Sequence, residues 1–113
     1  MPGLIAGQMM APPPNYGNRA DGTPKGSGFF GELQRPDGDF STELSIGVNL
    51  GKGEMEIPLL VPSLSRKEID YLLKGGEPTD EIVGKAVIHA RQRMATGASP
   101  FAAENERFDL PEE

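Results

Sequence analysis

The chain has 113 residues, of which 15 are glycine and 11 are proline, and only 36% are hydrophobic. This composition excludes one compact core formed by the whole chain, so part of it is expected to be extended or to pack on another molecule. The absence of cysteine and the single histidine exclude disulfides, thiolate metal sites and multi-histidine metal sites within one chain. A net charge of −6 opposes binding to nucleic-acid phosphates, and no apolar run has the length of a membrane span.

Residues 1–30 are predicted to form an extended arm, because glycine and proline interrupt every helical or strand period. Pro12–Pro14 favour polyproline II. A disordered terminus is the alternative. Apolar side chains on such a stretch favour docking on a partner, since burying each one could contribute roughly 1.5–3 kcal/mol. The predicted partner-binding residues are Leu4, Ile5, Met9, Met10, Tyr16, Phe29 and Phe30.

From residue 31 the pattern predicts a three-stranded antiparallel β-meander. A short strand at 31–35 is followed by a Pro-Asp-Gly turn at 36–39. The alternation over 41–50 places Thr42, Leu44, Ile46, Val48 and Leu50 on an inner face and Glu43 and Ser45 on an outer, solvated face with Glu54 and Glu56. The third strand has Met55, Ile57, Leu59 and Val61 on its inner face, and Pro58 marks an edge.

Two amphipathic helices are predicted next. Ser65 and Glu68 form a capping box, and Gly75 ends the first helix. The second helix begins near Pro78 and ends at Gly97. The fold class is therefore α+β, with the meander followed by two helices in a compact unit at 31–100. The remaining residues, 101–113, read as a solvated acidic tail. So small a unit is marginal alone, which favours oligomerisation or assembly on a larger body.

No residue pattern predicts catalysis, a cofactor or a bound metal. His89 lies on a predicted helix without an evident nucleophile or base to partner it. Ser41 and Thr42 are typical cross-strand hydroxyls, and the Glu54/Glu56 carboxylates are typical of a solvated strand face. Asp37-Gly38-Asp39 lacks the other ligands of a calcium loop. We therefore expect a non-enzymatic protein whose work is binding.

Several stretches carry a resemblance to one group of proteins. The Arg-Pro-Asp-Gly turn at 35–38, the strand Ser41–Val48 and the Ile-Pro-Leu-Leu-Val-Pro stretch at 57–62 resemble small uncharacterised proteins encoded in the structural-gene region of tailed bacteriophages. The stretches at 15–23, 25–29, 85–91 and 97–101 fit the same pattern, so the resemblance covers roughly residues 15–101. Leu59 stands where that group more usually has threonine, which puts any role of that hydroxyl in question.

The resemblance implies a virion-associated protein, assembled in the host cytoplasm, most plausibly in the tail or neck. Its expected partners are other virion proteins, in several symmetric copies, with no nucleic acid, membrane or small-molecule substrate. No catalytic residue carries over. The alternatives are an accessory protein that positions a phage peptidoglycan-degrading enzyme, a capsid-associated or internal ejected protein, and a host-directed regulator.

Overall fold

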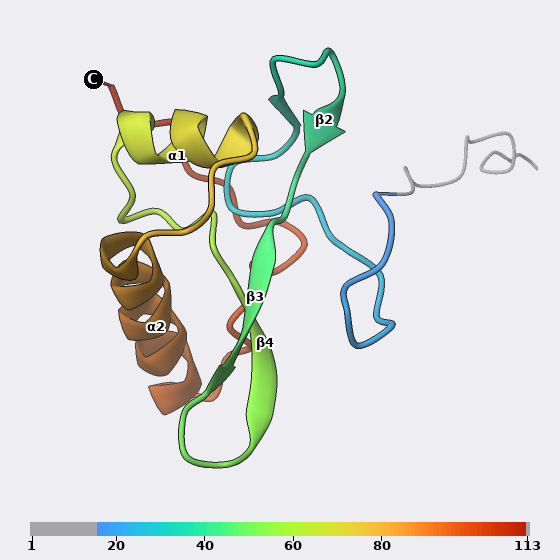
Figure 1. The fold of residues 1–113 in the computed structure, drawn as a ribbon. Helices are drawn as coiled ribbons and strands as arrows, with labels where there is room; N and C mark the ends of the chain where they lie inside the picture. Colours follow the sequence, from blue (N-terminus) through green and yellow to red (C-terminus); the bar gives the residue numbers. More distant parts are fainter. Residues whose placement is uncertain (1–15, 113) are drawn as a thin grey trace, which may run out of the picture.

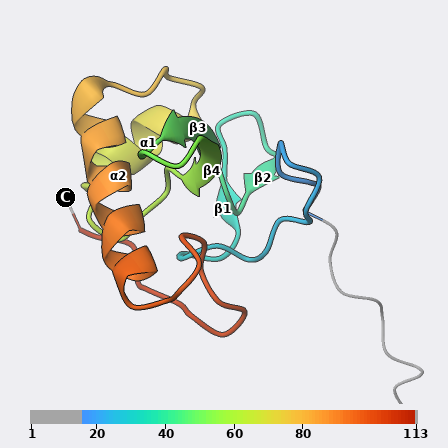
Figure 2. The same cartoon turned by 90° about the horizontal axis from the view of Figure 1, so that it is seen from below.

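The computed structural model describes residues 16–112 as a small α+β unit (Figure 1). Four short strands precede two helices along the chain, and the longer helix lies beside the longer pair of strands (Figures 1 and 2). The elements are β1 (Leu33–Gln34), β2 (Phe40–Ser41), β3 (Ser45–Asn49), β4 (Glu54–Pro58), α1 (Arg66–Leu73) and α2 (Asp80–Ala95). The predicted α+β class is thus confirmed.

The strands form two separate antiparallel hairpins instead of one three-stranded meander. β1 pairs only with β2, and β3 pairs only with β4. The predicted turn between the first two strands is present, because the Arg35 amide donates to the Asp39 carbonyl and Gly38 has a positive φ of 89°. The prediction went wrong in the run 41–50, which is not one continuous strand.

The break between β2 and β3 has a packing cause. Thr42 and Glu43 are both 3% exposed, so consecutive side chains are buried where strand alternation would expose one of them. The Thr42 backbone also packs closely on Gly28, where an added Cβ would lie 2.0 Å from the Thr42 carbonyl oxygen. Gly28, with φ of 73°, is therefore required for this contact. The assignment of Glu43 to a solvated outer face was wrong.

The β3–β4 hairpin follows the predicted alternation. Ile46 lies opposite Ile57, and Val48 lies opposite Met55. Ile57 is fully buried, whereas the other three side chains are partly buried against the core. The inner face of this hairpin is therefore confirmed, although β4 contributes more to the core than β3.

Both helices begin as their sequences predict. The Ser65 hydroxyl accepts from the Glu68 amide at 3.1 Å, and the Glu68 carboxylate accepts from the Ser65 amide at 2.8 Å. Thr79 caps α2 by accepting from the Ile82 amide. Local capping signals thus define the two helix starts.

The core lies between the β3–β4 hairpin, the two helices and the segment before β1. Phe29 is 1% exposed and Phe30 is 8% exposed. These two residues, predicted to bind a partner, instead fill this chain's own core. The remaining buried core residues are Leu33, Ile57, Leu59, Leu60, Val61, Leu64, Ile69, Leu72, Leu73, Ile82, Ala86 and Ala90.

The C-terminal segment also folds against the body, which corrects the prediction of a solvated tail. Phe101 is buried, and Leu110 packs on the core. The Phe108 amide donates to the Phe29 carbonyl at 2.8 Å. Arg93 on α2 binds both carboxylate oxygens of Glu106, at 3.0 and 2.9 Å. The segment therefore closes over Phe29.

Replacing Ile57 by Ala tests the position of the core. Because this side chain is fully buried, the substitution should lower the free energy of unfolding by about 2–5 kcal/mol. Ile88→Ala is the matched control, since Ile88 is 59% exposed and its truncation should change stability by no more than about 0.5 kcal/mol. Chemical denaturation of the two variants measures both values. Equal losses would contradict this placement of the core.

Candidate interaction site

A buried ion pair joins the N-terminal part of the described chain to the loop between β2 and β3. The Arg19 guanidinium donates from Nε to Oε1 and from Nη2 to Oε2 of Glu43, each at 2.7 Å. The Gly26 amide donates to the same carboxylate at 2.8 Å. The Glu43 hydrogen bond raises the pKa of the Arg19 guanidinium, although burial opposes the shift. Both carboxylate oxygens of Glu43 therefore accept hydrogen bonds, although the side chain is buried.

Arg19 is held in place by a tight local turn. The Arg19 amide donates to the Thr23 carbonyl at 2.7 Å, and Asn18 bridges to Pro24. Hydrogen bonds from the Thr23 hydroxyl and amide lower the pKa of Asp21, which stabilises the turn. The other face of the Arg19 guanidinium lies 4.0 Å from the centre of the Phe101 ring. The arginine therefore connects three segments that are far apart in the sequence.

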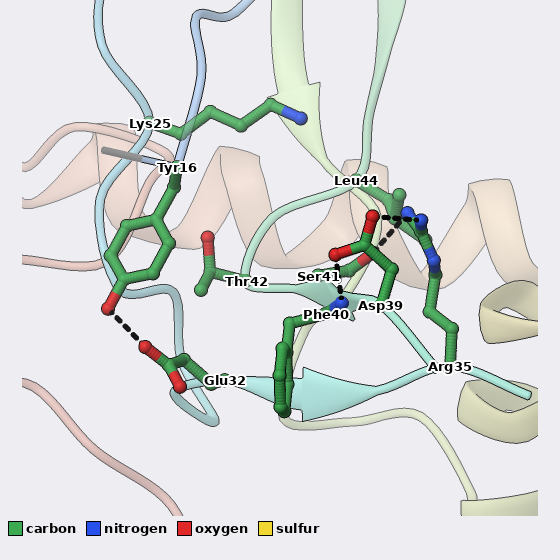
Figure 3. Close-up of a pocket in the computed structure, with 9 residues that line it drawn as sticks. All are labelled: Tyr16, Lys25, Glu32, Arg35, Asp39, Phe40, Ser41, Thr42 and Leu44. Atoms are coloured by element: carbon green, nitrogen blue, oxygen red, sulfur yellow. Dashed lines mark hydrogen bonds and ion pairs between the residues drawn. The ribbon is translucent and has the colours of Figure 1, made fainter. Parts of the chain in front are cut away.

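A polar pocket of about 520 Å³ lies beside this ion pair, between the segment 16–25 and the β1–β2 hairpin (Figure 3). Figure 3 shows the Tyr16 hydroxyl pointing toward Glu32, to which it donates at 2.9 Å. That hydrogen bond raises the pKa of Tyr16. On the other side Arg35 lies 3.2 Å from Asp39 and donates to the Ser41 hydroxyl.

Most polar groups of the pocket are already satisfied within the chain. Glu32 and Asp39 each have a hydrogen-bond or ion-pair partner, whereas the ammonium of Lys25 forms neither with a described residue. The Thr42 hydroxyl is buried without a partner in the part of the chain described. The exposed ring of Phe40 borders the opening. This arrangement of charged and polar groups can contact a polar surface.

His89 does not form a catalytic pair with any described residue. Its ring packs edge-on against Phe29, with centroids 4.9 Å apart, and its buried Nδ1 has no hydrogen-bond partner among residues 16–112. Burial lowers the pKa of His89, Arg93 lowers it further, and Glu106 opposes them. The histidine is thus a packing residue of α2.

Three of the other candidate carboxylates are held by structural contacts. Glu56 accepts from the Ser45 hydroxyl at 2.9 Å, and Asp37 and Asp39 both pair with Arg35. Residues 16–112 contain no group of three or more side chains that could hold a metal ion. Among the helices described, neither is long and apolar enough to cross a membrane.

The predicted partner-binding residues have different outcomes. Leu4, Ile5, Met9 and Met10 lie outside the described residues. Tyr16 lines the polar pocket. Phe29 and Phe30 belong to the core, so their side chains are not exposed to a partner.

Sequence reasoning missed three exposed apolar side chains: Phe40, Ile88 and Phe108 are 52%, 59% and 44% exposed. It also missed the Arg19–Glu43 pair, because nothing local links residues 24 positions apart. A buried glutamate inside an alternating strand pattern gives no sequence signal of its own.

Comparison with known proteins found no match among family models, curated proteins or solved structures. The geometry of the described residues is therefore the main support for any functional proposal, beside the resemblance of the sequence motifs.

Replacing Glu43 by Gln tests the ion pair. The variant leaves Arg19 without its carboxylate in a largely buried setting, so the free energy of unfolding should fall by about 3 kcal/mol. Glu54→Gln is the control, because Glu54 is exposed and forms no ion pair with a described residue. Chemical denaturation compares them, and equal stability of the two variants would refute a structural role for the pair.

Replacing His89 by Gln tests its burial through the pH dependence of stability. The folded chain holds the imidazole neutral at pH values where the unfolded chain protonates it, because the folded pKa lies below the ordinary 6.5. Stability should therefore decline as the pH falls below about 6.5, and the Gln variant should decline less over that window. Denaturation at pH 7.5, 6.5 and 5.5 checks this. Parallel curves for both proteins would contradict it.

Proposed function

We propose that this chain is a non-enzymatic structural component of a tailed-phage virion, in its tail or neck. It assembles through its N-terminal arm and its small α+β unit onto larger virion proteins, in several symmetric copies. The phage context comes from the sequence resemblance at 15–101, and the assembly role comes from the arrangement of the described residues.

The observation that carries the assembly role is the fixed start of the described chain. The Arg19–Glu43 ion pair and the Tyr16–Glu32 hydrogen bond tie residues 16–19 to the body. The preceding segment 1–15 contains no charged residue and includes five large apolar side chains. A firmly anchored base with an uncharged apolar extension suits an arm that binds a neighbouring protein.

Two further features support binding over chemistry. Phe40, Ile88 and Phe108 are exposed apolar side chains, each of which can add buried apolar area to a contact with another protein. Among the candidate catalytic side chains of the described residues, His89 is held by packing and Glu56 by a hydrogen bond.

Particle composition separates this proposal from its alternatives. A structural component is present in every purified particle at a fixed stoichiometry, which quantitative mass spectrometry measures. A protein that positions a peptidoglycan-degrading enzyme would vary with that enzyme, and a host-directed regulator would be absent from particles. A density map of the particle would distinguish a tail or neck position from a capsid or internal one.

Deleting residues 1–14 should sharply reduce incorporation into particles while leaving the circular dichroism spectrum of the remaining body unchanged. The reason is that the described core and its ion pairs involve residues 16–112. Replacing Leu4, Ile5, Met9 and Met10 together by Ser preserves the arm's length and should have the same effect. Incorporation is measured by mass spectrometry of purified particles. Unchanged incorporation of both variants would rule out the arm as an anchor.

A further inference from the structure

The β3–β4 hairpin has two edges that differ in their hydrogen-bonding capacity. The Leu59 amide donates to the Leu44 carbonyl at 2.7 Å, which makes 44 and 59 a hydrogen-bonded pair of the ladder. Such pairs alternate along an antiparallel ladder, so Ile46–Ile57 and Val48–Met55 are also of this type in the observed register. The backbone N–H and C=O groups of Ser45, Gly47 and Asn49 consequently point away from β4, and no other described strand pairs with them.

The β4 edge has features that oppose the addition of another strand. Pro58 lies opposite Ser45 in a non-hydrogen-bonded pair. A residue at this position directs its backbone N–H away from β3, so proline leaves the outer edge of β4 without a donor there. Glu54 and Glu56 place two negative charges along the same strand, and α2 contacts this strand. Proline and charge are devices by which proteins block strand edges.

The β3 edge carries none of these devices. Its sequence, Ser-Ile-Gly-Val-Asn, contains no charge and no proline, and both Gly47 and Asn49 are exposed. Beside the start of β3 lies a hollow of about 350 Å³. Its lining is mainly apolar and includes Leu44, Ile46, Leu59, Leu72 and Pro78. An exposed edge next to an apolar hollow is suited to β-strand addition, in which main-chain bonds give affinity and a side-chain pocket gives specificity.

We propose that residues 4–10 of a neighbouring copy of this chain add to the β3 edge as an extra strand. This inference rests on the proposed assembly function and names the docking surface for the arm. The stretch 3–11 is the longest proline-free run before Tyr16, so it can offer an unbroken row of backbone donors. It is also uncharged, like β3, and its apolar side chains suit the hollow.

The length of the arm is compatible with this exchange. Fifteen residues precede Tyr16, and an extended chain spans up to about 3.3–3.6 Å per residue, or roughly 50 Å in all. That reach exceeds the two shorter dimensions of the molecule, 34 and 24 Å. The arm can therefore leave the body that anchors it and reach the next copy.

Cysteine cross-linking on the full chain tests the proposal. Because the chain has no natural cysteine, a disulfide between introduced cysteines reports their own contact. A chain carrying Met9→Cys is mixed with one carrying Asn49→Cys, on the β3 edge, or with one carrying Glu54→Cys, the cross-strand partner of Asn49 on the β4 edge. Both positions are exposed, and the Asn49 mixture should give about tenfold more mixed disulfide dimer than the Glu54 mixture.

A proline pair tests whether the contact is a backbone ladder. Ser45→Pro removes an outward N–H from the β3 edge, and Glu56→Pro removes one from the β4 edge, while both variants lose the Ser45–Glu56 side-chain hydrogen bond. Introduced into the cysteine-bearing chain, Ser45→Pro should abolish most of the Met9–Asn49 cross-link, and Glu56→Pro should preserve it. Variants are compared only where circular dichroism shows the native fold.

Several results would overturn the proposal. Equal cross-linking to both edges, or no cross-linking to either, would overturn it, and so would equal effects of the two proline substitutions. A chain that carries both Met9→Cys and Asn49→Cys and forms the disulfide only within itself would also overturn it, because the proposal requires contact between two copies. Cross-linking of Asn49→Cys chains to one another in preference to Met9→Cys would show that β3 pairs with β3 of a second copy instead. The proposed function has a separate readout, which is the presence of the chain in purified particles. Presence in particles without arm–edge cross-linking would support the proposed function and contradict this inference. Arm–edge cross-linking in a chain that is absent from particles would support this inference and contradict the proposed function.

Discussion

The buried ion pair between Arg19 and Glu43 determines how the N-terminal half of this molecule is arranged. Burying a carboxylate is unfavourable unless an opposite charge lies beside it and its oxygen lone pairs accept hydrogen bonds. Here the Arg19 guanidinium supplies the charge and two hydrogen bonds, and the Gly26 amide supplies a third hydrogen bond. Both oxygens of the carboxylate are therefore used, and the turn at 18–24 can occupy only a narrow range of positions relative to β2.

The same ion pair accounts for the division of the strands into two hairpins. A continuous strand through 41–50 would direct the side chains of residues 42 and 43 to opposite faces. Both are buried in this structure, which requires the chain to leave the strand conformation between β2 and β3. The β1–β2 hairpin is consequently separated from β3, whose outer edge lacks the neighbour that a meander would have supplied.

The accuracy of the sequence analysis depended on how local each signal was. The capping box at Ser65, the turn ending at Gly38 and the alternation of Ile46 with Val48 involve neighbours a few residues apart, and all three are present. Composition alone assigned Phe29 and Phe30 to a partner, because a segment rich in glycine has no period that would indicate burial in its own chain. The polar pocket was not predictable, since it joins Tyr16 to Glu32 and Lys25 to Thr42 only after folding.

Phe29 is the point at which the two ends of the described chain meet. Its carbonyl accepts from the Phe108 amide, and the guanidinium of Arg93 lies 5.2 Å from the centre of its ring. Arg93 also binds Glu106, which holds the C-terminal segment over Phe29. The Arg19–Glu43 pair and the enclosed Phe29 therefore connect the turn at 18–24 to the core through side chains. The Tyr16–Glu32 hydrogen bond adds a contact at the residue before β1, so the start of the described chain is held at the β1–β2 hairpin as well as at the core.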